Sequence, residues 1–393
     1  MMKKTVLGYL FSQVHQPFFA LGIFNAILFM ILFTIPKSVS AEFPLSLFHA
    51  YAMIFAVFGN FFYGFLLTTF TRFSARPPIA PRVYLNIFSL NLLSSLSLLA
   101  YPLLHESFYA ASIFEALSLV YLMRTFHSIY LLAPEPKNDQ YWILVSLGMA
   151  SLSNLLFLLY EIPCGSCSKI VFYRYGVDIG IYLFLTLLSA VVAFRMVPFF
   201  SGSMLYERSR YFHPLLFTLL LLHVLLDSLY PGALFLCDFA ISLLLVVELM
   251  RMELPIPSKE PLLWSLHLAL FWLPLAFFVG AIVEFFEAWF SYHSFRLPLH
   301  MLLLGYLTTL LIAFGTRVTL GHGGAVLRVD GFGRFIFYFT QFVLLARVLY
   351  SLTEASSPLL YIAAVAWIAL FVLWSVKYGS ILLMGAGKRG GER

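Results

Sequence analysis

Apolar runs long enough to cross a membrane recur from one end of the chain to the other, separated by short proline-, glycine- or charge-containing breaks. A helix needs about 20 apolar residues to cross a hydrocarbon core roughly 30 Å thick. Of the 393 residues, 62% are hydrophobic and 11% are charged, whereas a soluble globular protein carries about 25% charged residues. We therefore expect lipid to be the solvent of this chain, and residues 1–393 to form a single integral membrane domain.

Backbone groups inside lipid must bond to one another, so runs of this length predict helices. The sequence thus predicts an all-α fold, a polytopic membrane bundle of about twelve transmembrane helices. The expected spans are 17–35, 47–70, 83–104, 108–132, 141–161, 175–198, 213–230, 232–253, 262–287, 298–320, 333–352 and 357–381.

Lysine and arginine accumulate on the cytoplasmic side of membrane proteins and so orient the bundle. With the N-terminus inside, all but five of the 24 basic residues fall in inner segments. Both termini are therefore expected in the cytoplasm. The net charge of +6 follows from this topology and calls for no nucleic-acid partner. The five exceptions are Lys37, Lys169, Arg174, Arg296 and Arg347.

Two histidines lie at matching depth near the outer ends of different spans. His49 and His300 are two or three residues inside the second and tenth spans. Paired imidazoles across a bundle are what axial ligation of a haem iron requires, and imidazole also suits copper. Alternatively, both rings are interfacial and reach the headgroup level.

Basic side chains mark two further candidate positions. Arg347 lies inside the eleventh span, where it would either clamp an anion such as a haem propionate or extend to the outer headgroups. The stretch FGTRVTLGHGG, residues 314–324, places Arg317 and His322 where the tenth span ends. Glycines around His322 suit close approach to a ligand and equally suit a tight turn.

Other polar residues in the spans leave alternatives open. His223 and Asp227 share a helix face, which suits a relay, although a bond from His223 to a neighbouring helix explains it as well. Glu284 and Glu287 end the ninth span as a cation guide or as solvated residues. Glu115 and Asp238 lie deeper, with no partner evident from the sequence.

The cysteines divide into a pair and a single residue. Cys164 and Cys167 stand in an outer loop, where an oxidising compartment predicts a disulfide between them. A copper-binding thiolate pair is the alternative. Cys237 is expected to be a buried small hydrophobe.

Four stretches resemble the NnrS family of membrane proteins, which is linked to nitric oxide metabolism and associated with haem and copper. They are HQPFF from His15, FHAYAMIFAVFGNFFYGFLLT from Phe48, FRMVPFF from Phe194 and LHMLLLGYLTTLLIAFGTRVTLGHGG from Leu299. The resemblance implies a multi-pass protein of the bacterial cytoplasmic membrane. It also implies a cofactor or anion role for the pair Arg317 and His322. The metal ligands implied are His15, His49, His300 and His322.

One departure from the family pattern concerns the second span. Where the family often has a second histidine and an acidic residue, this chain has Tyr51 and Ala52. The resemblance therefore implies haem more strongly than copper. It suggests a haem-binding sensor, scavenger or weak enzyme of the nitric oxide stress response or of denitrification, with nitric oxide or a related small molecule as ligand. The alternatives are a twelve-helix secondary transporter for a small ion or metabolite, and a scaffold for assembling oxidase or reductase complexes.

Overall fold

In the computed structural model, the described residues are 6–34, 44–162, 169–203, 206–290, 293–353 and 357–386. Within these ranges the chain contains helices and no strand, as the length of its apolar runs predicts. The predicted disulfide of Cys164 and Cys167 lies outside the described residues. Cys237 is buried, as expected, and its thiol donates to the carbonyl of Leu219 at 3.3 Å.

The chain divides into two compact units. Unit 1 comprises residues 1–188 together with 382–393, and unit 2 comprises residues 189–381. In unit 1, α6 packs between α5 and α7, and α2 packs against η2 and α4. The elements of unit 1 are α1 (Val6–Leu10), α2 (His15–Thr34), α3 (Leu45–Tyr51), η2 (Ala52–Gly59), α4 (Asn60–Phe73), α5 (Pro81–Ala100), α6 (Ser107–Leu131), α7 (Asn138–Glu161), α8 (Lys169–Asp178) and η3 (Ile179–Thr186).

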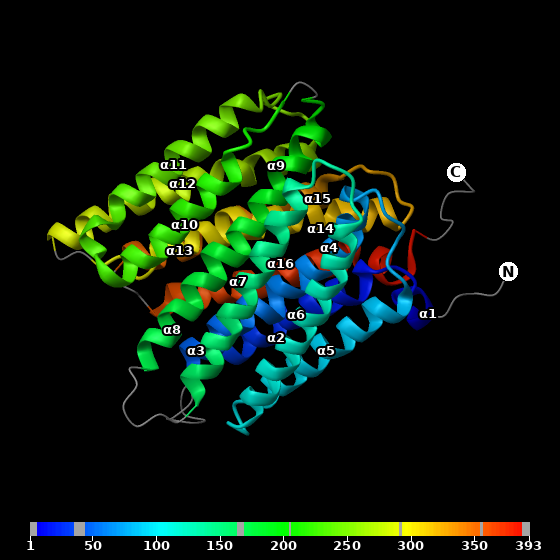
Figure 1. Ribbon diagram of the computed structural model, residues 1–393, viewed down its shortest axis with the longest axis horizontal. Helices are drawn as coiled ribbons and strands as arrows, with labels where there is room; N and C mark the ends of the chain where they lie inside the picture. The colour runs from blue at the N-terminus through cyan, green and yellow to red at the C-terminus, as the bar shows by residue number, and fades with distance from the viewer. Residues whose placement is uncertain are drawn as a thin grey trace. The chain divides into compact units, whose positions relative to one another are not determined.

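Unit 2 is organised around its longest helix, α12 (Pro261–Phe290), which packs against α11, η5 and α14. The helices α10, α11 and α12 lie side by side (Figure 1). The boundary between the units falls inside α9 (Leu187–Ser201). The other elements are α10 (Phe212–Leu229), η4 (Pro231–Ala233), α11 (Leu234–Arg251), α13 (Leu297–His300), η5 (Met301–Thr308), α14 (Thr309–His322), α15 (Gly331–Leu352) and α16 (Ser357–Met384).

The helices match the expected spans one for one. Among the described residues, twelve long helical segments coincide with the twelve apolar runs, so the all-α polytopic fold is confirmed. Eleven of them are long and apolar enough to cross a membrane. The remaining one is α6, whose 25 residues include Glu115 and Arg124. Glu115 is buried and accepts a hydrogen bond from the Tyr63 hydroxyl at 2.7 Å, so α6 turns a polar face into unit 1.

Three of the long segments contain an eight-residue π-helix, namely η2, η3 and η5. In η5 the Thr308 hydroxyl donates to the carbonyl of Leu303, five residues earlier, which matches the wider turn. Such turns are rare and often occur at functional sites. His49 precedes η2 by three residues and His300 directly precedes η5, so both candidate ligands stand where the helical turn widens.

Candidate functional site

The last residue of α13, His300, lies next to Arg347 of α15. Nη2 of Arg347 lies 3.1 Å from Nδ1 of His300 and donates to the carbonyl of Phe295 at 2.9 Å. Its Nη1 donates to the hydroxyl of Ser351 at 2.5 Å, and the guanidinium stacks over the Tyr350 ring. Arg347 is only 8% exposed. No partner of Arg347 in the described part of the chain is a carboxylate, so its charge is buried without a counter-ion there.

The chemistry of His300 follows from its neighbours. Nδ1 also lies 2.9 Å from the carbonyl of Arg296, one helical turn earlier. If Nδ1 donates to this carbonyl, Nε2 keeps the coordinating lone pair; if Nδ1 instead accepts from the Arg347 guanidinium, which only donates, the ring proton is on Nε2. Metal ligation through Nε2 requires the first of these two tautomers. Two positive charges 3.1 Å apart would repel, so the adjacent guanidinium is compatible with a neutral ring. The neutral imidazole is the form that ligates a metal.

Arg317 and His322 lie at the opposite end of α14. The guanidinium of Arg317 stacks over the Phe200 ring, 3.9 Å from its centroid. One residue after Phe200, the Ser201 hydroxyl lies 2.7 Å from Nε2 of His267. His322 ends α14 half-buried, before the turn in which Gly324 has a positive φ of 72°. The structure thus gives Arg317 an aromatic neighbour in Phe200, and the proposed pairing of Arg317 with His322 stays a prediction.

Two candidate histidines of unit 1, His49 and His15, lie beside aromatic rings. His49 is half-buried, with its ring 4.4 Å from that of Phe33. His15 is 2% exposed at the start of α2, next to Phe19. His49 belongs to unit 1 and His300 to unit 2, so their pairing stays a prediction.

Tyr51, which replaces the second histidine of the family pattern, has a defined partner. Its ring is fully buried and its hydroxyl donates to Oδ1 of Asn154 at 2.8 Å. The same oxygen accepts from the Ser112 hydroxyl at 3.1 Å. The position of the second imidazole of the family pattern is thus occupied by a hydrogen-bonded phenol.

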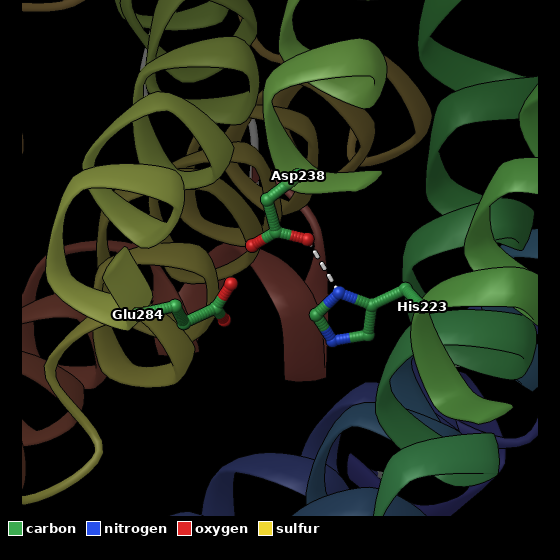
Figure 2. Close-up of side chains that lie close together, drawn as sticks. All are labelled: His223, Asp238 and Glu284. Carbon is green, nitrogen blue, oxygen red and sulfur yellow. Dashed lines mark hydrogen bonds and ion pairs between the residues drawn. The ribbon is translucent and has the colours of Figure 1, made fainter. Parts of the chain in front are cut away.

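A second polar cluster of unit 2 combines His223, Asp238 and Glu284, from α10, α11 and α12 (Figure 2). Nδ1 of His223 lies 2.5 Å from Oδ1 of Asp238, and one ligand atom from each residue lies within 4.8 Å of the others. His223 therefore bonds to the neighbouring helix, which is one of the two interpretations of the sequence. The partner of Asp238 was not evident from the sequence, although all three residues lie at similar depth from their helix ends.

The stretches that carry the family resemblance meet in pairs inside each unit. In unit 1 the ring of Phe19 lies 5.5 Å from that of Phe61. A Cβ at Gly64 would lie 2.7 Å from Cβ of Phe18, so glycine allows this close approach of α2 and α4. In unit 2 Phe200 contacts both Phe314 and Arg317. The motifs are thus packing partners as well as candidate sites.

Comparison with known proteins agrees with these motifs. The family model described as "NnrS protein" matches residues 9–384, nearly the whole chain. No curated protein matches the chain. Because the match runs from the first helix to the last and includes all four stretches, the chain belongs to the NnrS family.

Proposed function

We propose that this protein is a haem-binding integral membrane protein of the bacterial cytoplasmic membrane, acting in the nitric oxide stress response or in denitrification. Its membership of a family linked to nitric oxide metabolism, over residues 9–384, carries the proposal. Within the chain, His300 is the proposed axial ligand. Arg347 is the proposed partner of a haem propionate.

The residues around His300 fit a haem group. A haem needs a neutral imidazole for its iron and a cationic group for its propionates. His300 has its Nδ1 beside a carbonyl, and Arg347 has a buried guanidinium with uncharged partners. When bound, a haem would supply an iron that binds diatomic gases, while His300 would hold it and Arg347 would orient its edge. His49, His15, His322 and Arg317 stay as further predicted cofactor residues.

Copper fits the described donors less well. The position of the second imidazole holds Tyr51, which is hydrogen-bonded to Asn154, and the next position holds Ala52, which has no donor atom. Copper sites rely on imidazole or thiolate ligands. We therefore keep copper as a secondary proposal that depends on residues other than Tyr51 and Ala52.

The function is tested with the purified protein, reduced and exposed to nitric oxide. We expect a Soret band in the wild type and a shift of this band when nitric oxide is added, because the gas competes for an axial position. A parallel assay measures the uptake of small ions and metabolites by proteoliposomes that contain the protein, and so tests the transporter alternative. The proposal would be contradicted if the protein had no Soret band, or if nitric oxide left the position of the band unchanged. Accumulation of an ion or metabolite in the vesicles would favour transport.

A further inference from the structure

The cluster of His223, Asp238 and Glu284 places three potential metal ligands together inside three apolar helices. Figure 2 shows the imidazole and both carboxylates pointing toward one another. Donor atoms around a first-row metal ion lie about 3–3.5 Å apart, given ligand bonds of about 2.0–2.2 Å. The three ligand atoms lie within 4.8 Å of one another, so small side-chain rotations would bring them to one ion.

Charge burial indicates that this cluster has a purpose beyond packing. His223 is 3% exposed and Asp238 is 2% exposed, and ionisable residues in this setting are costly and mark functional sites. Oε2 of Glu284 is buried without a hydrogen-bond partner. No lysine or arginine of the described residues forms an ion pair with Asp238 or Glu284. A cation between the carboxylates would supply the missing charge and occupy the unbonded oxygen.

Gly280 gives independent support, because it makes room for the carboxylate of Asp238. A Cβ at Gly280 would lie 2.6 Å from Oδ2 of Asp238 and 3.4 Å from Cβ of Pro298. Gly280 is one helical turn before Glu284 on α12, so the same helix supplies a ligand and clears space for the other. Any side chain at position 280 would displace the Asp238 carboxylate.

Acidic residues lead from the cluster to the helix ends. His223 and Glu284 are six residues from the ends of α10 and α12, and Asp238 is four residues from the start of α11. At about 1.5 Å per residue these positions lie about 6–9 Å below the ends. Asp227 is half-buried and Glu287 is exposed, and both interact electrostatically with Glu284. On the predicted topology they would attract cations from the outer side.

The donor set determines the class of ion. One imidazole nitrogen and two carboxylate oxygens suit first-row divalent ions such as Zn²⁺, Mn²⁺ and Fe²⁺, whereas Cu(I) selects sulfur. The nearest sulfur in sequence, that of Cys237, bonds to the carbonyl of Leu219 on α10. From these contacts we infer that His223, Asp238 and Glu284 form a binding site for a first-row divalent metal ion, separate from the haem proposed at His300.

Metal titration of the full-length, tag-free protein tests this inference. Protein stripped with a chelator is titrated with Zn²⁺ and its metal content is measured. We expect about one zinc ion per chain to depend on the cluster, and an affinity loss of about tenfold or more in Asp238→Asn, Glu284→Gln and Gly280→Ala. Glu115→Gln, which changes a buried carboxylate of unit 1, and Gly315→Ala, where a Cβ meets nothing within 4 Å, should bind zinc like the wild type.

The readouts separate this site from the haem proposal. The cluster variants should keep the haem content of the wild type. The metal site and the haem site are therefore tested independently, and either proposal can fail without the other. Glu284→Gln and Gly280→Ala keep the experiment decisive if Asp238→Asn does not fold, which gel filtration shows. A wild type that binds no zinc, or cluster variants that bind zinc as the wild type does, would overturn the inference.

Discussion

Replacing His300 by alanine is expected to remove haem from the purified protein. The structure places this ring 3.1 Å from the buried guanidinium of Arg347. Outer-shell partners of a metal ligand already contribute about 10–100-fold to affinity. Loss of the ligand itself should therefore lower the haem content by about tenfold or more. The Soret absorbance per chain measures this.

The matched control for this variant is His293→Ala, which removes an exposed histidine seven residues earlier, before α13 begins. It should keep the haem content of the wild type. His49→Ala belongs in the same series, because the sequence predicts His49 as a second ligand. Unchanged Soret absorbance in His300→Ala would remove this residue from the site, and the same result in His49→Ala would remove the predicted partner.

Arg347→Leu is expected to weaken haem retention, or to shift the haem potential, without lowering the protein yield. The guanidinium is buried and its partners are a carbonyl, a hydroxyl and two rings. A hydrogen bond to a charged group contributes about 1.5–3 kcal/mol, so its loss should lower haem affinity by about tenfold to a hundredfold. Haem retention during gel filtration and a redox titration measure the two effects.

The lysine variant separates charge from geometry at the same position. Arg347→Lys should recover only part of the retention, because an ammonium cannot reproduce the planar fork of the guanidinium. Arg334→Leu, an exposed arginine on the same helix, serves as the control and should behave like the wild type. Full haem at an unchanged potential in Arg347→Leu would reduce the residue to an anchor at the membrane surface.

Much of the fold was predictable because the backbone N–H and C=O groups of every segment inside lipid must be hydrogen-bonded within the protein. Apolar runs between breaks such as YPGA predicted each helix, and η4 with the start of α11 marks that break in the structure. The three π-helices were not predictable. The stretches AMIFAVFG and MLLLGYLT carry ordinary helix formers. A contact across the unit accompanies the widened turn of η5, where Gly305 lies against the Trp272 ring.

For the proposed haem site, the sequence predicted how deep each residue lies in its span but not the direction in which its side chain points. Matching depths singled out His300, and the position of Arg347 within its span singled out the arginine, yet their contact depends on the rotation of α13 and α15. A helix that is apolar on all sides gives no periodicity from which to read that rotation. The partner of Asp238 was unpredictable for the same reason, because His223 lies at similar depth on another helix and helix rotation decides whether the two side chains meet.

The decisive measurement of the proposed haem binding is the haem-to-chain ratio of the wild type. The protein would be produced in haem-replete cells, purified in mild detergent, and assayed by pyridine haemochrome against its concentration. We expect a ratio near that of a stoichiometric cofactor, retained through gel filtration. Well-folded, monodisperse protein that carries no haem under these conditions would contradict it.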